Sequence, residues 1–170
     1  SQDGIYNDDL GIATSNVFAV ASAINLTDTS HYITSVFPQG SLDIYSGAME
    51  QLTVSGSTGP DLQTLADTAG VGSLVVLDTG AIGSGGAPLA GRRVMLPLGR
   101  DAQFNWDYLN ANGRLLLHRA LRWGMGADKL IGAKKLLLVV ANAGSPTSQE
   151  DAKQALIESW GYPVTLIDDS

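Results

Sequence analysis

The chain has 170 residues, near the usual length of one domain, and its 44% hydrophobic and 16% charged content excludes a disordered protein. Ten Lys and Arg against seventeen Asp and Glu give a net charge of −7, which disfavours binding to nucleic acid or to anionic membrane surfaces. The chain contains no cysteine, so disulfides, thiolate nucleophiles and zinc–thiolate sites are excluded.

Residues 1–68 are polar and rich in turn-forming residues. Short β-type runs at 17–24, 42–45 and 51–54 are separated by Gly, Ser, Asp and Pro, which predicts an irregular, β-rich amino-terminal part. Residues 1–20 lack a basic start followed by an apolar core, so no signal peptide is expected. A mature secreted chain has the same appearance.

The middle of the chain predicts two strands and a helix. The strands, 73–79 and 92–98, flank the glycine-rich stretch Gly80–Gly86, and a hairpin is one arrangement that this spacing allows. Residues 107–123 form an amphipathic helix that ends at Gly124. Its predicted apolar face contains Leu109, Leu116, Leu117, Ala120, Leu121 and Trp123, and its polar face contains Arg114, Arg119 and Arg122.

The carboxyl-terminal part predicts a βαβ unit. Residues 125–133, which contain two glycines, are a linker candidate, and residues 134–141, with the continuous apolar run 136–141, are typical of a buried parallel strand. This run is too short to cross a membrane, so no membrane insertion is expected. Ser148 with Asp151 predicts a capping box for a helix over 149–160, and 163–167 is the next strand.

Arg92–Gly99 followed by Leu109–Trp123 resembles the closing strand and helix of ThuA-like modules of the class I glutamine amidotransferase-like superfamily. Asn25–Ile33 and Lys135–Asp169 resemble an earlier segment and the opening βαβ of such modules. The resemblance implies a flavodoxin-like fold and a place in large secreted bacterial proteins. The order of the two halves is reversed here, and the stretch that bears the amidotransferase nucleophile is missing, so the chain looks permuted or cut across a module boundary.

We therefore predict an α/β fold: a three-layer α/β/α sandwich with a flavodoxin-like parallel sheet of strands near 74–78, 93–97, 135–141 and 163–167. The predicted division is a carboxyl-terminal-type half of a ThuA-like module over 1–124, a linker over 125–133, and an opening βαβ unit over 134–170. This last unit packs either on its own domain or on a neighbouring subunit.

Three groups of residues are candidate sites. Asp78-Thr79-Gly80 matches the active-site triplet of retroviral-type aspartic proteases. Such an enzyme also needs a second hydrophobic strand and a helix closing on a Gly-Arg pair, whereas Gly91-Arg92-Arg93 here begins the 92–98 strand. Ligand binding is predicted for the loop after the 134–141 strand, because open α/β sheets bind ligands at the carboxyl ends of their strands. Weak Ca²⁺ binding by an oxygen-rich cluster is the metal-site candidate. The ligand candidates are Asn142, Ser145 and Ser148, and the Ca²⁺ candidates are Asp3, Asn7, Asp8 and Asp9.

Each candidate has a plain structural alternative: a strand-to-turn Asp-Thr-Gly, a polar βα turn with a helix cap, and a solvated acidic turn. His31 and His118 have no visible catalytic frame, so both are interpreted as structural. No glycine loop both follows a strand and opens a helix, so no flavin, nicotinamide or nucleotide cofactor is expected.

No catalytic residue is predicted, and the leading hypothesis is a non-catalytic structural subunit of an extracellular or cell-surface assembly. The family pattern places further strands beyond 163–167 that this chain does not supply, so its open strand edge predicts head-to-tail assembly with copies of itself. The second hypothesis is a ligand- or carbohydrate-binding module of a secreted protein. The third is a hydrolase that uses Asp78 in the manner of an aspartic protease.

Overall fold

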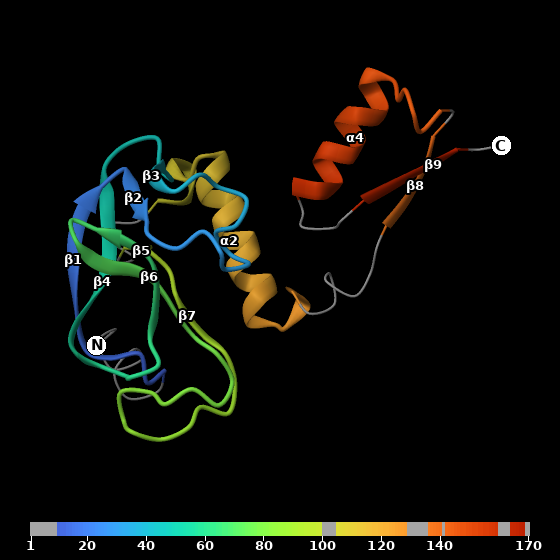
Figure 1. Ribbon diagram of the computed structural model, residues 1–170. Helices are drawn as coiled ribbons and strands as arrows, with labels where there is room; N and C mark the ends of the chain where they lie inside the picture. The colour runs from blue at the N-terminus through green and yellow to red at the C-terminus, as the bar shows by residue number, and fades with distance from the viewer. Residues whose placement is uncertain (1–9, 100–104, 129–135, 141, 160–163, 169–170) are drawn as a thin grey trace. The chain divides into compact units, whose positions relative to one another are not determined.

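The computed structural model, shown in Figure 1, describes residues 10–99, 105–128, 136–140, 142–159 and 164–168. The chain divides into two compact units, Ser1–Met125 and Gly126–Ser170, called unit 1 and unit 2 below. Among the described residues, no helix is long and apolar enough to cross a membrane.

Unit 1 is built on antiparallel strands. Its larger sheet has five strands in the order β3–β2–β5–β6–β7, and its smaller sheet pairs β1 with β4. The strands are β1 (Ala13–Ala21), β2 (Ala23–Leu26), β3 (Gly40–Asp43), β4 (Met49–Thr58), β5 (Gln63–Thr68), β6 (Val71–Leu77) and β7 (Arg93–Met95).

A two-residue turn joins β5 to β6 and fixes their antiparallel direction. Ala69 and Gly70 both have positive φ, 53° and 80°. Positive φ at both central residues matches a type I′ turn, whose twist suits a tight hairpin. Strands joined in this way cannot be neighbours in a parallel sheet, which needs a long crossover between them.

A short 3-10 helix, η3 (Trp106–Tyr108), precedes the one long helix described in unit 1, α2 (Ala111–Gly124). The Asn110 side chain caps α2 by accepting a hydrogen bond from the Gly113 amide. Gly113 lies against the chain after β3, where an added Cβ would come within 2.3 Å of the Ile44 carbonyl oxygen. Glycine therefore lets the first turn of α2 approach this backbone closely.

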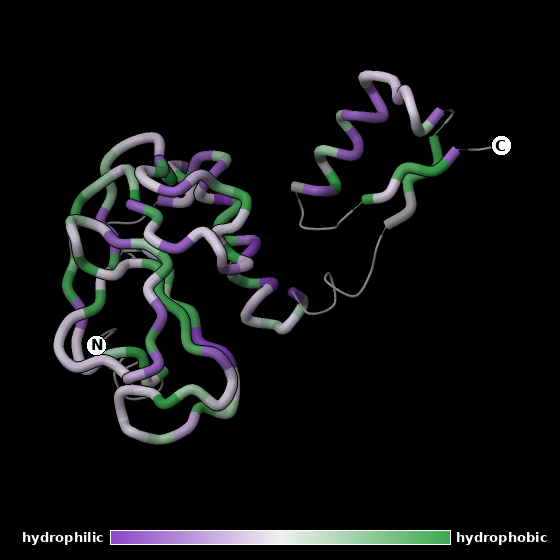
Figure 2. The backbone as a smooth tube through the Cα atoms, in the orientation of Figure 1, coloured by the Kyte–Doolittle hydropathy of each residue, from purple (hydrophilic) through white to green (hydrophobic). Residues whose placement is uncertain are grey.

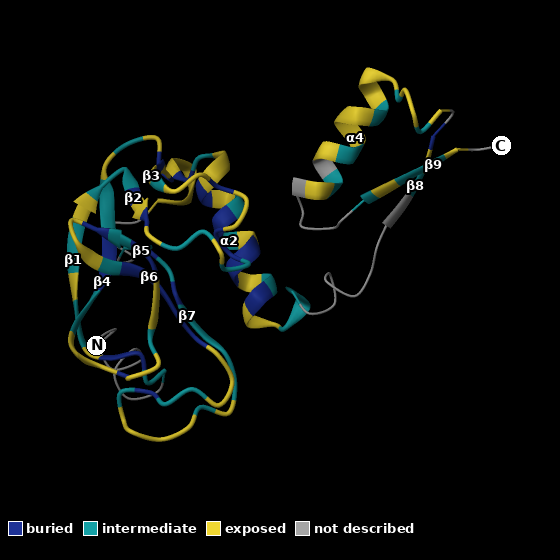
Figure 3. Cartoon of the chain, in the orientation of Figure 1, coloured by how far each residue is buried: buried dark blue, intermediate teal, exposed yellow. Residues whose placement is uncertain are grey.

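Two hydrophobic cores lie in unit 1, and β6 contributes to both. Most residues of β6 are buried, as the burial colours in Figure 3 indicate. Leu74 and Val76 belong to the core that α2 shares, whereas Val75 and Leu77 belong to the core beside β1 and β4. The larger core also contains Ile24, Leu26, Ile33, Phe37, Leu42, Ile44, Tyr45, Leu65, Ala66, Leu109, Leu116, Ala120 and Trp123.

The predicted flavodoxin-like α/β/α sandwich is wrong. The predicted strand near 93–97 pairs antiparallel with the one near 74–78, in the hairpin arrangement that the spacing also allowed. The continuous apolar run of β6 is typical of a parallel strand covered by helices, which is why the sequence predicts one. It is continuous because a separate core covers each of its faces.

The predicted faces of the 107–123 helix are only partly correct. Trp123 and Leu116 are buried as predicted. Arg119, placed on the polar face, is 2% exposed, whereas Leu121, placed on the apolar face, is exposed. The burial of Arg119 is tolerated because the backbone carbonyl groups of Tyr32 and Ile33 accept hydrogen bonds from its guanidinium group.

Unit 2 contains β8 (Leu136–Val140), α4 (Ser148–Ser159) and β9 (Val164–Asp168). The two strands pair in parallel, as the predicted βαβ unit requires, and hydrophobic residues follow both of them in Figure 2. The helix cap differs from the prediction by one residue. Thr147 Oγ1 accepts from the Glu150 amide, and Glu150 Oε2 accepts from the Thr147 amide, so the capping box is Thr147/Glu150 rather than Ser148/Asp151.

Candidate functional site

Charged and aromatic side chains gather in unit 1 where β6, β7, the segment after β2 and the end of α2 meet. The group, called the arginine–aromatic cluster below, consists of Asp28, His31, Tyr32, Asp78, Arg92, Arg119 and Trp123. It combines an ion pair, a buried arginine and two arginine–aromatic contacts, so we take it as the candidate site.

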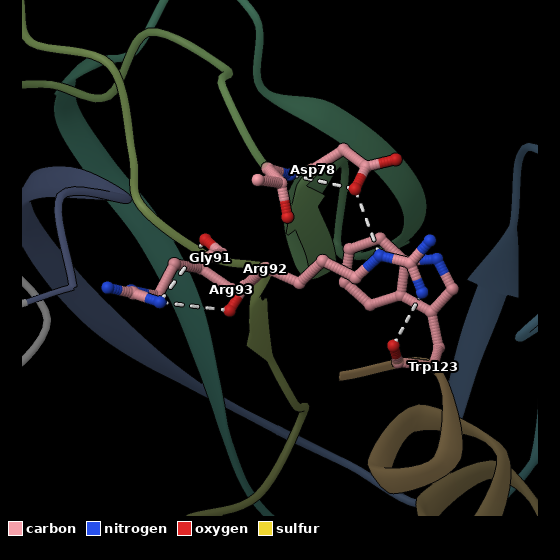
Figure 4. Close-up of polar contacts among 6 residues, drawn as sticks. Asp78, Gly91, Arg92, Arg93 and Trp123 are labelled. Carbon is pink, nitrogen blue, oxygen red and sulfur yellow. Dashed lines mark hydrogen bonds and ion pairs between the residues drawn. The ribbon is translucent and has the colours of Figure 1, made fainter. Parts of the chain in front are cut away.

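Arg92 joins the end of β6 to the end of α2 (Figure 4). Its Nε donates to Asp78 Oδ1 at 2.9 Å, and its Nη1 donates to the Trp123 carbonyl oxygen at 2.7 Å. The guanidinium carbon also lies 4.6 Å from the centre of the Trp123 ring, a cation–π distance. A cation at a helix carboxyl terminus is favoured by the helix dipole, so Arg92 acts as a cross-link between sheet and helix.

Asp78 lies at the turn after β6, where its Oδ1 also accepts from the Thr79 amide at 2.7 Å. An aspartic protease needs this carboxylate beside a second one, with a proton shared between them. In unit 1 this carboxylate forms an ion pair with the Arg92 guanidinium group. These contacts favour the structural interpretation of Asp78-Thr79-Gly80.

Arg119 is buried, and its side chain donates hydrogen bonds to the segment after β2. Its Nε donates to the Ile33 carbonyl oxygen at 3.0 Å, and its Nη2 donates to the Tyr32 carbonyl oxygen and to Ser35 Oγ. The guanidinium carbon lies 4.2 Å from the centre of the Tyr32 ring. Burial lowers the pKa of Arg119, and no described carboxylate forms an ion pair with it. Carbonyl dipoles and one aromatic ring therefore stabilise this buried cation.

His31 lies between the contacts of Arg92 and those of Arg119, because it touches Trp123 and Ile33. Its ring meets the Trp123 ring edge-on, with 5.1 Å between the ring centres, and its Nδ1 accepts from the Ile33 amide. His118, the other candidate histidine, is exposed on α2 and lies outside the cluster. The contacts of His31 agree with its structural interpretation.

Asp28 shapes the start of this segment as an Asx-type turn. Its Oδ1 accepts from the Ser30 amide at 2.8 Å and the Ser30 hydroxyl at 2.7 Å, and its Oδ2 accepts from Gln63 Nε2 at 2.7 Å. The Ser30 hydrogen bonds hold the pKa of Asp28 below its usual value, with smaller contributions from Gln63 and His31. The ionised carboxylate is thus the form that orders the turn.

We expect Asp28 to contribute to the acid sensitivity of folding. Because its pKa is lower in the folded than in the unfolded chain, its stabilisation is present above the ordinary value of 3.8 and is lost as the pH falls through the folded pKa. Asp28→Asn should therefore lower the unfolding midpoint in urea at pH 7, with the difference from the parent chain shrinking below about pH 4. Asp43→Asn, on an exposed side chain of β3, is the control. A difference that stays constant between pH 7 and pH 3 would contradict this assignment.

The predicted ligand residues Asn142, Ser145 and Ser148 are all exposed, in the β8–α4 connection and the first turn of α4. Asn142 Oδ1 accepts from the Gly144 amide, and the Asp168 carboxylate accepts from the Ala143 amide. Glu150 occupies the start of α4 by the capping box described above. These are the contacts of a polar βα turn, and carboxylates already use the amides that an anionic ligand would need. Ligand binding here stays a prediction.

The predicted Ca²⁺ residues Asp3, Asn7, Asp8 and Asp9 lie outside the described residues, so this site also stays a prediction. Among the residues that are described, no three His, Asp or Glu side chains gather in a way that could hold a metal ion.

Comparison with known proteins finds no matching family model, and no curated protein or solved structure matches the chain. The resemblance to ThuA-like modules therefore remains a prediction, whereas the flavodoxin-like fold that it implied is corrected above.

Sequence patterns alone do not identify the central residues of the cluster, Arg92, Arg119 and Tyr32. One signal was available for Arg119, because it lies three residues after the buried Leu116 and four before the buried Trp123. That spacing places it on the apolar face of the helix whatever its charge. The partners of Arg92 and Tyr32 are distant in sequence, so local patterns carry no signal for them.

Proposed function

We propose that this protein is a non-catalytic structural module that assembles head to tail with copies of itself, as a subunit of an extracellular or cell-surface assembly. The observation that carries the proposal is an apolar face of the β8–β9 pair that the described part of unit 2 leaves uncovered. The uses of Asp78, Arg92 and Arg119 as cross-links within unit 1 support a structural role for the candidate site.

The two faces of the β8–β9 pair differ in burial. Side chains alternate between faces along each strand. Leu138, Val140 and Leu166 share a face on which Val140 is buried and the other two are half-buried. Val139, Thr165 and Ile167 share the opposite face, where Val139 is 58% exposed, Thr165 is exposed and Ile167 is half-buried. Parallel strands are normally covered on both faces, so the described residues of unit 2 leave the Val139 face without a second layer.

Unit 1 has an apolar stripe on α2 of the type that packs on such a sheet face. Leu117, Leu121 and Met125 follow one another at intervals of four residues along α2 and its C-cap, where they form one stripe of the helix. Leu117 is half-buried, whereas Leu121 and Met125 are exposed. An apolar helix stripe and an apolar sheet face are the two surfaces that pack together in layered α/β structures.

Packing of the Val139 face of one copy on the α2 stripe of the next joins two different surfaces. Such a heterologous contact repeats from copy to copy and gives a ring or a filament. The low content of charged residues supports this role, because few charges have to be desolvated when copies pack closely. The same low charge and the lack of cysteine are compatible with a place outside the cytoplasm.

The test uses the full chain, light scattering over a concentration series and negative-stain imaging. We expect particles of the parent chain to grow with concentration. Val139→Lys and Leu121→Lys should each stop this growth, because each places an ammonium group inside the contact. Val36→Lys, at a 41% exposed valine between β2 and β3, makes the same change in net charge and should assemble like the parent chain.

Mixing the two variants tests the head-to-tail geometry. Each variant keeps the surface that the other lacks, so an equimolar mixture should form larger particles than either variant alone. Circular dichroism confirms that each variant keeps its secondary structure. If the parent chain shows no growth at high concentration, or if both lysine variants grow like Val36→Lys, the proposed assembly is wrong.

A further inference from the structure

The strand β1 lies at the outer edge of unit 1 in Figure 1. Among the described strands it pairs with β4 alone, in a register that runs from Ala13↔Thr58 to Ala21↔Met49. A strand paired on one side presents backbone N–H and C=O groups on its other side. This edge is nine residues long, which is long for an edge strand.

Proteins usually protect such an edge with charges, proline, a bulge or a very short strand. From Ala13 to Ala21 the strand contains neither a charged residue nor a proline. Its register is irregular only at the start, between Ala13 and Ser15. Val17 and Val20, both β-branched, are 47% and 69% exposed. The composition therefore favours pairing with a further strand.

The exposure pattern of β1 is symmetric about Val17. The exposed residues are Thr14, Val17 and Val20, and every other residue from Ser15 to Ala21 is half-buried. A two-fold axis through Val17 between two antiparallel copies of the strand places Val17 opposite Val17, and Thr14 opposite Val20. Thr14 and Val20 share one face of the strand and Val17 lies on the other, so each exposed side chain meets an exposed β-branched partner.

We propose that β1 is a dimerisation edge, at which the β1 strands of two copies pair antiparallel about Val17 and join their two β1–β4 sheets into one sheet of four strands. The occupant is a second copy because the strand is complementary to itself in exposure and in side-chain shape. The pairing also brings no charged side chain of the strand opposite another, which matters for a chain with a net charge of −7.

This contact is isologous and closes on itself, unlike the head-to-tail contact proposed above, and it uses different residues. The two proposals therefore fail separately. In the Val139→Lys chain the head-to-tail contact is disabled, and the β1 pairing predicts a species of twice the mass of one chain. If the head-to-tail proposal is wrong, the parent chain itself should show this species.

A single engineered cysteine tests the geometry directly, since the chain has no other cysteine. Residues directly opposite in an antiparallel pair have Cα atoms about 4.5 or 5.5 Å apart, within the range of about 4.4–6.8 Å that disulfides span. Val17→Cys should therefore form a covalent dimer under mild oxidation, at dilutions where Val36→Cys, with similar exposure, stays unlinked.

A charge variant provides the complementary test by analytical ultracentrifugation. Val17→Lys, made in the Val139→Lys chain, places two ammonium groups opposite each other and should shift the dimer to the mass of one chain. Val36→Lys in the same background should leave the dimer intact, and matching circular dichroism spectra exclude unfolding as the cause. A Val139→Lys chain that is monomeric at high concentration, a dimer that survives Val17→Lys, or equal cross-linking of the two cysteine variants would overturn the proposal.

Discussion

Arg119→Met is expected to lower the free energy of unfolding by about 3 kcal/mol. The substitution leaves the carbonyl oxygens of Tyr32 and Ile33 without the donor that they have in the folded protein. Each buried acceptor that loses its hydrogen bond costs about 1–3 kcal/mol. Part of this loss is offset, because methionine avoids the desolvation of a buried guanidinium group that has no described ion-pair partner. Urea denaturation measures the difference.

Two further variants separate the geometry of Arg119 from its charge. Arg119→Lys keeps the charge but replaces the planar fork with one ammonium group, so most of the loss should remain. Arg114→Met removes the same group from an exposed position of α2, where Nε donates to the Leu109 carbonyl oxygen, and should cost less than about 1 kcal/mol. Equal losses for Arg119→Met and Arg114→Met would show that Arg119 does not hold the 31–35 segment.

The positions of several elements could be predicted from sequence because their signals are local. A buried apolar run predicted β6, helical periodicity predicted α2, and the apolar run followed by a capped helix predicted the parallel βαβ of unit 2. Each of these patterns depends on neighbours within a few residues. The predicted and observed boundaries of these elements differ by only a few residues. The capping box, for example, begins at Thr147 and not at Ser148.

The sheet topology could not be predicted, because the turn that sets it lacks the usual sequence signature. The β5–β6 turn uses Ala69-Gly70, and alanine is an unusual residue at positive φ, so the usual Asn-Gly signature of a type I′ hairpin is missing. The strand β5 was not predicted at all. Without β5, the sequence predicts no antiparallel neighbour for β6 on its amino-terminal side. A parallel sheet then explains the burial of β6, although the spacing also allowed a hairpin with the 92–98 strand.

The candidate site was missed for a related reason. The charge of Arg119 predicts a position on the solvent side of α2, although an arginine is tolerated inside a protein when its donors meet acceptors. Those acceptors come from residues 32–35, more than eighty positions earlier in the chain. The helix period marks the position of Arg119 as buried, but only the fold shows what makes its burial tolerable.

Trp123→Ala is expected to have the largest effect, a loss of about 3–5 kcal/mol in the free energy of unfolding. The indole is almost fully buried in the larger core, Arg92 lies over its ring and the His31 ring meets its edge. Its removal leaves a cavity and also takes away the surface on which the Arg92 guanidinium group is stacked. The Arg92 hydrogen bond to the backbone carbonyl of residue 123 can persist in the variant. The loss in free energy of unfolding therefore reports the contribution of the indole side chain.

Trp106→Ala is the matched control for this prediction, because it makes the same change in η3 at a side chain that is 58% exposed. Its loss should stay below about 1 kcal/mol. Denaturation of both variants in urea, with the slope of the transition compared with that of the parent chain, separates lost packing from a changed unfolded state. If Trp123→Ala and Trp106→Ala lose the same small amount, then Trp123 does not anchor α2 on the sheet, and the arginine–aromatic cluster is not the junction between helix and sheet that its contacts indicate.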